Sequence, residues 1–173
     1  KGKYDLITMN FSLEYFEPPK IFKKIYSLLN KNGILYIKCG YWWHMYTPSK
    51  IFSKNNPYLV QRYKKAKIIN LLKKEKFNLK HFEDMYNYFH KGKFKPVIED
   101  YLNFALKQNF EIVSAQRFIP NKVILDNIKK EATPVEINYK KIKKILGDIK
   151  KNKNNVTIED LYTLSFSLIL KKN

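Results

Sequence analysis

A histidine lies within a dense aromatic stretch of the sequence, YWWHMY at residues 41–46. Imidazole ionises near neutral pH, so His44 is the strongest candidate for a general base. The aromatic residues beside it are Tyr41, Trp42, Trp43 and Tyr46. Such a cluster is typical of a pocket wall or of a buried core, and both interpretations stay open. His81 and His90 are competing histidines, and any of the three can be a packed or solvent-facing ring instead.

A second group of residues could bind an anion. Arg62 and Tyr63 lie together in a basic and aromatic segment at residues 58–65, where they would suit a phosphate or carboxylate on a substrate. The alternative is a solvated helix surface. Cys39 is the sole cysteine, which excludes a disulfide framework and a cysteine-rich zinc site. At a strand end it is more typical of a small buried residue than of a nucleophile.

These residues need a scaffold, and the apolar pattern predicts one of mixed α/β type. The predicted strands are residues 4–9, 34–37, 110–119 and 161–170. Helices are predicted from Pro18 and from Pro96, with Asn32-Gly33 as a left-handed cap after the first. The first strand, helix and second strand form a βαβ unit, which favours a parallel pair. The final segment alternates with period two, as expected of a strand with two different faces.

Two long segments interrupt this scaffold. Residues 41–95 mix short helical runs with prolines and asparagines, and residues 120–157 include a lysine-rich amphipathic helix. Segments of this length between core elements are typically lids or substrate caps. We therefore expect one domain over residues 1–173, with 41–95 as a helical lid and 120–157 as a second helical insertion.

Composition narrows the class of protein. Hydrophobic residues make up 45% of the chain, enough for a packed core, and no apolar run is long enough to span a bilayer. The net charge of +19 arises almost entirely from lysines spread along the chain, since only Arg62 and Arg117 are arginines. Specific nucleic-acid recognition favours arginine, so nucleic acid is a possible but not a favoured partner. We expect a soluble, cytoplasmic protein with a preference for acidic ligands.

The order of these segments resembles the class I S-adenosylmethionine-dependent methyltransferases. YDLI at residues 4–7 resembles the family's fourth strand, and the loop NFSLEY at 10–15 resembles its "LEH" loop with tyrosine in place of histidine. LLNKNGILYI at 28–37 is similar to the family's "LLKPGGxLxI", and ALKQNFEIV at 105–113 to "ALxxxGFExV". The resemblance covers about half of the chain.

The resemblance implies a Rossmann-like sheet in which strands four to seven are present and the last is antiparallel. It implies S-adenosylmethionine as the cofactor, with Asn10, Phe11 and Ser12 near its methionine end. The acceptor pocket would then follow the second predicted strand. Its implied acceptor-binding residues are Tyr41, Trp42, Trp43, Tyr46, Arg62 and Tyr63, with His44 as the catalytic base. The implied reaction is an O-methyl transfer to a small molecule or glycan, of anionic or sugar type.

The family's glycine-rich cofactor loop is not in this sequence, because none of the five glycines forms a G-x-G pattern. Residues 4–9 would be an exposed apolar edge without a neighbouring strand. We therefore expect the cofactor-binding half to lie upstream or on another chain. Two alternatives stay open: a non-catalytic methyltransferase-like subunit, and an RNA methyltransferase that binds nucleic acid through its lysines.

Overall fold

The structure is a computed structural model that describes residues 3–40, 43, 58–90, 95–119 and 139–173. The chain divides into two compact units, each assembled from segments distant in the sequence. The first comprises Lys1–Trp42, Gly92–Ile119 and Thr163–Asn173, and the second comprises Trp43–Lys91 and Pro120–Tyr162. The second unit overlaps both segments predicted as insertions, 41–95 and 120–157; their role as lids stays a prediction.

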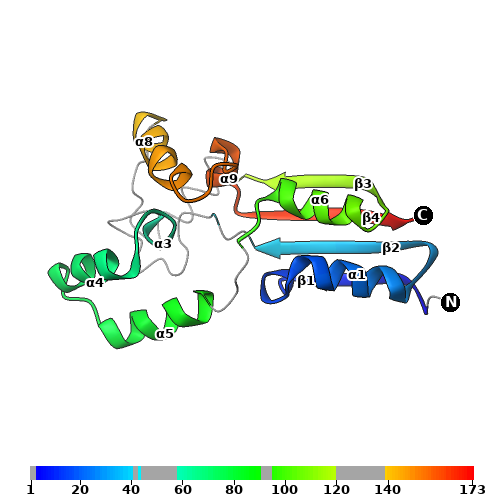
Figure 1. The fold of residues 1–173 in the computed structure, drawn as a ribbon, viewed down its shortest axis with the longest axis horizontal. Helices are drawn as coiled ribbons and strands as arrows, with labels where there is room; N and C mark the ends of the chain where they lie inside the picture. The colour runs from blue at the N-terminus through cyan, green and yellow to red at the C-terminus, as the bar shows by residue number, and fades with distance from the viewer. Residues whose placement is uncertain (1–2, 41–42, 44–57, 91–94, 120–138) are drawn as a thin grey trace. The chain divides into compact units, whose positions relative to one another are not determined.

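A four-stranded sheet forms the centre of the first unit (Figure 1). Its strands are β1 (Tyr4–Asn10), β2 (Leu29–Gly40), β3 (Phe110–Phe118) and β4 (Ser165–Lys172). Their order across the sheet is β1-β2-β4-β3, in which β1 and β2 are parallel and β4 is antiparallel to both of its neighbours. The mixed α/β class and the antiparallel final strand are thus confirmed. The numbering of these strands as the fourth to seventh of a larger sheet stays a prediction.

Two helices cover one face of this sheet. Helix α1 (Pro18–Leu28) contacts β2, α6 (Ile98–Lys107) contacts β3, and the two helices contact each other. The buried strand side chains include Leu35, Ile37, Phe110, Phe166, Leu168 and Leu170. The residues between them, such as Tyr36, Lys38 and Ser167, stay partly or fully exposed. Because successive strand residues point to opposite faces, the sheet has one apolar face under the helices and one more polar face.

The turn between α1 and β2 is tighter than predicted. The helix runs directly into the strand, so β2 begins before the expected residue 34. Asn32 adopts the left-handed conformation predicted for the Asn32-Gly33 pair, at φ 63°, but within the strand and not at the helix end. A Cβ atom on Gly33 would lie 2.9 Å from the Asn30 carbonyl oxygen and 3.2 Å from that of Tyr4. This close approach of β1 requires glycine.

The predicted strand at residues 161–170 is wrong at its start, because Ile158–Tyr162 forms helix α9. The backbone N–H of Thr157 donates to the Asp160 carboxylate at 2.8 Å, and the N–H of Asp160 donates to the Thr157 hydroxyl at 3.3 Å. This reciprocal capping fixes a helical turn. The alternation of apolar residues continues through that turn by coincidence, so the pattern placed the strand start too early.

The second unit is helical over its described residues. Its helices are α3 (Leu59–Arg62), α4 (Lys65–Lys74), α5 (Leu79–His90), α8 (Tyr139–Lys150) and α9. Their buried side chains include Ile68, Leu72, Phe82, Ile142, Ile145 and Ile149. The buried hydroxyl of Tyr58 donates to the carbonyl of Leu161, which links the two segments of this unit. None of the helices in the described parts is long and apolar enough to cross a membrane.

Lys172 ties the last strand to the C-terminal end of α1. Its ammonium group donates to the carbonyl oxygens of Tyr26 at 2.9 Å and Leu29 at 2.7 Å, and it lies over the Tyr26 ring. A lysine in this place satisfies carbonyl groups that a helix end leaves without partners.

We expect Lys172→Met to lower the free energy of unfolding by about 1–3 kcal/mol, the usual loss for hydrogen bonds to a charged group. The matched control is Lys171→Met. Lys171 forms only a partly exposed ion pair with Glu111 at 3.7 Å, so its loss should stay within about 0.5 kcal/mol. Urea unfolding of the full-length protein measures both changes. Equal losses in the two variants would contradict this role for Lys172.

Candidate functional site

The loop that follows β1 contacts the carboxyl end of the parallel strand β2. The backbone N–H of Phe11, directly after β1, donates to the carbonyl of Lys38 on β2 at 2.7 Å. Phe11 adopts a left-handed φ of 49°, and 55% of the residue is exposed. This conformation is unfavourable for a bulky residue and recurs at functional sites. In open α/β sheets ligands bind at this edge, so the loop at residues 10–12 is a candidate binding element.

The same edge holds a thiol beside a carboxylate. Leu13–Tyr15 forms the short helix η1, and the Cys39 thiol donates to Glu14 Oε2 at 2.6 Å. Cys39 is only 1% exposed. Burial, and then the hydrogen bond to the Glu14 carboxylate, raises the pKa of the Cys39 thiol far above its ordinary value. Cys39 is therefore a buried residue, as its position predicted, and not a nucleophile. Its hydrogen bond to Glu14 links η1 to β2.

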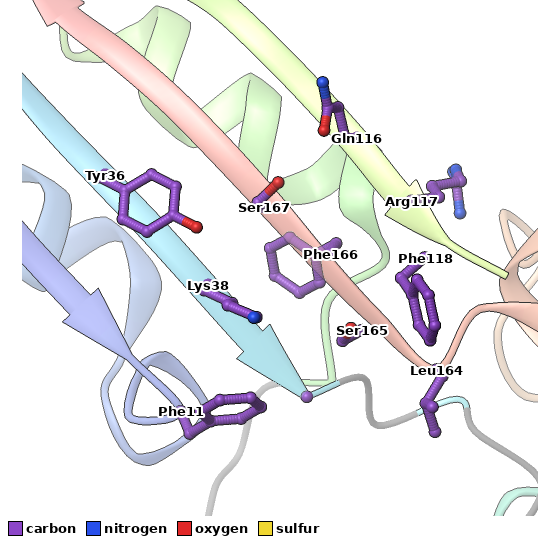
Figure 2. Close-up of a pocket in the computed structure, with 11 residues that line it drawn as sticks. Phe11, Tyr36, Lys38, Gln116, Arg117, Phe118, Leu164, Ser165, Phe166 and Ser167 are labelled. Atoms are coloured by element: carbon purple, nitrogen blue, oxygen red, sulfur yellow. The ribbon is translucent and has the colours of Figure 1, made fainter. Parts of the chain in front are cut away.

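A hollow of about 620 Å³ lies in the first unit (Figure 2). Its polar lining comes from three adjacent strands: Tyr36 and Lys38 on β2, Ser165 and Ser167 on β4, and Gln116 on β3. Aromatic side chains border it, with Phe11 on one side and Phe118 on the other (Figure 2). Gly40 lies at the end of β2, and a Cβ atom there would meet no described residue within 4 Å.

The polar residues of this hollow were not predicted from the sequence. The available signal was the alternation in residues 165–170, which separates serines from large apolar side chains. That pattern predicts which side chains of this single strand lie on the same face of the sheet. It does not give the register that places Lys38 and Gln116 on either side of Ser167.

The predicted site residues fall into three groups. Asn10, Phe11 and Ser12 lie together at the carboxyl edge of the first unit. Trp43, Arg62 and Tyr63 belong to the second unit. The remaining predicted residues, Tyr41, Trp42, His44 and Tyr46, lie outside the described residues. The roles assigned to all of them stay predictions.

Arg62 is engaged in contacts within the second unit. Its guanidinium donates to Asp148 on α8 at 3.1 Å and lies over the Tyr63 ring, 4.7 Å from the centroid. Partial burial pushes the Asp148 pKa up, but Arg62 and Lys151 outweigh this effect and the pKa is lowered. Lys67 lies over the same Tyr63 ring, at 4.4 Å. These contacts give Arg62 a structural function, so any anion binding by it would compete with Asp148.

Trp43 is 4% exposed, and its indole N–H has no hydrogen-bond partner in the part of the chain that the structure describes. Its burial favours the core interpretation for this tryptophan. The described side chains include no group of three or more histidine, cysteine, aspartate or glutamate residues that could hold a metal ion.

No family model and no curated protein matches the sequence. Solved structures give weak similarities. An S-adenosylmethionine-dependent methyltransferase from Mesorhizobium loti aligns with 99% of this chain and 63% of its own, at 13% identity and TM-score 0.48. The cyclopropane synthase MmaA2 from Mycobacterium tuberculosis aligns with 99% and 56%, at 15% identity and TM-score 0.47.

Phosphoethanolamine N-methyltransferase 2 from Haemonchus contortus, solved with S-adenosyl-L-methionine, aligns with 97% of this chain and 33% of its own, at 13% identity and TM-score 0.45. The chain thus spans between a third and two thirds of the length of these proteins. At these identities and TM-scores the similarities do not assign the chain to a family.

We expect the Cys39 thiol to stay protonated in the native protein. At pH 8 a thiol with an ordinary pKa of 9.0 is about one-tenth thiolate. The raised pKa should slow the reaction of native Cys39 with an aromatic disulfide reagent by about 100-fold or more relative to the urea-unfolded chain. Glu14→Gln removes the charge that contributes to this shift and should partly restore reactivity. Rapid labelling of the native wild-type protein would contradict this expectation.

The same shift has a defined effect on stability. The folded-state pKa lies above the unfolded value, so the stabilisation by this thiol is complete below pH 9.0 and is lost as the pH rises further. Cys39→Ala should therefore show a shallower loss of stability above that pH than the wild type.

Proposed function

We propose that the chain is the acceptor-side half of an S-adenosylmethionine-dependent methyltransferase that acts on a small molecule or glycan, most simply on an oxygen atom. The observation that carries this proposal is the position of β4. The last strand of the chain is inserted antiparallel between β2 and β3, in the arrangement that the sequence resemblance implies for its seventh strand.

The loop at residues 10–12 fits one end of such a cofactor. Asn10 and Phe11 are exposed and Ser12 is half-exposed, and Ser12 precedes η1 without capping it through its side chain. These uncharged groups and an aromatic ring suit a sulfonium and its neighbouring atoms. Bound S-adenosylmethionine would supply an electrophilic methyl group. The residues described here do not supply a glycine-rich cradle, so we propose that a further segment, upstream or on another chain, supplies it.

The edge of the sheet supports that addition. β1 pairs with β2 alone in the described sheet, and Tyr4 and Leu6 on it are 51% and 58% exposed. An apolar edge strand with free backbone groups is a template for another strand. A strand paired parallel to β1 would bind its free backbone groups, flank Tyr4 and Leu6, and extend the carboxyl edge at which residues 10–12 lie.

The chain's own contribution to the reaction would be positioning and proton transfer. His44 would accept the proton that the acceptor hydroxyl loses as the oxygen attacks. The acceptor would be enclosed by Tyr41, Trp42, Trp43 and Tyr46, with Arg62 and Tyr63 near its anionic part. Aromatic enclosure excludes water, which would otherwise compete for an electrophilic methyl group.

Calorimetry of the full-length protein tests cofactor binding. We expect S-adenosylmethionine and its demethylated product to bind with dissociation constants below about 1 mM. Ser12→Ala should weaken binding by about tenfold, through one lost hydrogen bond in an enclosed site. The control is Ser27→Ala, whose hydroxyl bonds to the Lys24 carbonyl on α1. If neither S-adenosylmethionine nor its demethylated product binds, the proposed function is refuted.

A turnover assay tests the proposed base. We expect His44→Ala to lower kcat by about 10²–10⁴-fold, the usual range for a general base, and to leave the unfolding midpoint unchanged. His81→Ala, an exposed position on α5, is the control. If His44→Ala turns over at the wild-type rate, His44 has no part in the mechanism.

A further inference from the structure

The hollow in the first unit contains a row of hydrogen-bond donors that crosses three strands. Lys38 on β2 pairs with Ser167 on β4, and Ser167 pairs in turn with Gln116 on β3. All three line the hollow (Figure 2). An ammonium, a hydroxyl and an amide group therefore follow one another at the strand spacing of about 4.8 Å.

No described carboxylate neutralises the positive charge that Lys38 gives to this row. None of the described residues that line the hollow is acidic. Lys38 is exposed and forms no ion pair with any carboxylate in the described ranges. Arg117, which also borders the hollow, pairs with Glu99 on α6 at 2.7 Å. The cation available to a ligand is thus Lys38, which lies at one end of the row, followed by the neutral donors Ser167 and Gln116.

The next row along the strands is shaped differently. Gly40 pairs with Ser165, and Ser165 pairs with Phe118. Among the described residues, Gly40 leaves open space above the strand, while 44% of Phe118 and 55% of Phe11 are exposed at the two sides. The hollow thus has open space at Gly40, between the exposed rings of Phe11 and Phe118. This space lies next to the donor row.

The geometry points to a binding site for a phosphate monoester of a ring compound, with the phosphate on the Lys38–Ser167–Gln116 row and the ring over Gly40. A phosphate has enough acceptor oxygens for donors from three strands, and lysine binds it as a point charge. A carboxylate has only two oxygens, one fewer than the number of donor residues in this row. A volume of about 620 Å³ lies within the range of small-molecule pockets.

This phosphate site is additional to the acceptor pocket proposed for methyl transfer, although the hollow shares Phe11 with the loop proposed for the cofactor. As a phosphate site it does not depend on methyl transfer. Binding of the phosphate probe is therefore measured without cofactor, so that failure of one proposal is distinguishable from failure of the other.

The test is calorimetric titration of the full-length protein with phenyl phosphate, inorganic phosphate and phenol at fixed ionic strength. We expect phenyl phosphate to bind at least about tenfold more tightly than either fragment, since it occupies both rows. Lys38→Met should weaken its binding by about tenfold or more, through loss of the charged donor. Lys24→Met, which removes the same charge from an exposed position on α1, should leave binding within about twofold.

Gly40→Val provides a second variant that does not remove charge. An added Cβ there meets nothing within 4 Å, so the fold should be retained while the side chain fills the floor of the hollow. We expect phenyl phosphate binding to fall by about tenfold or more, with an unchanged circular dichroism spectrum and unfolding midpoint.

Four outcomes would overturn the inference. The first is no binding of phenyl phosphate by the wild type, as expected if another polypeptide covers this face. The second is an equal loss in Lys24→Met, which would indicate a nonspecific lysine surface. The third is binding that neither Lys38→Met nor folded Gly40→Val weakens. The fourth is inorganic phosphate binding as tightly as phenyl phosphate, which would exclude the ring compound.

Discussion

The pairing of β4 between β2 and β3 holds the first unit together. β3 is joined to the rest of the sheet through β4 alone, because the order is β1-β2-β4-β3. The partners are distant in the sequence: Ile34 pairs with Lys171, and Gly40 with Ser165. Closing so long a loop costs conformational entropy before any contact forms. The buried Leu168 and Leu170, together with the Lys172 contacts to α1, offset that cost on the helix-covered side.

The same strand determines what the other side of the sheet can do. Since its residues alternate between two faces, each large residue that enters the core leaves a neighbour pointing away from it. Phe166 and Leu168 are buried, and Ser165 and Ser167 are left on the more polar face. Packing against the helices and presentation of a donor row are therefore consequences of one register. A slip by one residue would bury the serines and expose the apolar side chains.

How much of this the sequence could predict depends on whether a feature is local. The prolines that open α1 and the alternation in β4 act over a few residues, and both were predicted from their patterns. Asn32 was predicted as a helix cap, and its left-handed conformation lies within β2 instead. The antiparallel insertion of β4 came from resemblance to a family, since no local signal states which strands become neighbours. α9 was missed because its capping by Thr157 and Asp160 competes with a strand-like pattern that continues across it. The donor row was missed because it exists only in the register of three strands.

Lys38 connects the two parts of the proposed site. Its carbonyl oxygen accepts the hydrogen bond that holds Phe11 in a left-handed conformation, while its side chain lines the hollow. A residue with φ above zero persists only where its surroundings hold it there. A ligand that draws β2 or the Lys38 side chain into a new position would therefore act on the loop at residues 10–12 through one backbone contact. The loop proposed for the cofactor and the proposed phosphate row would then be coupled without any additional element, because both contact the carboxyl end of β2.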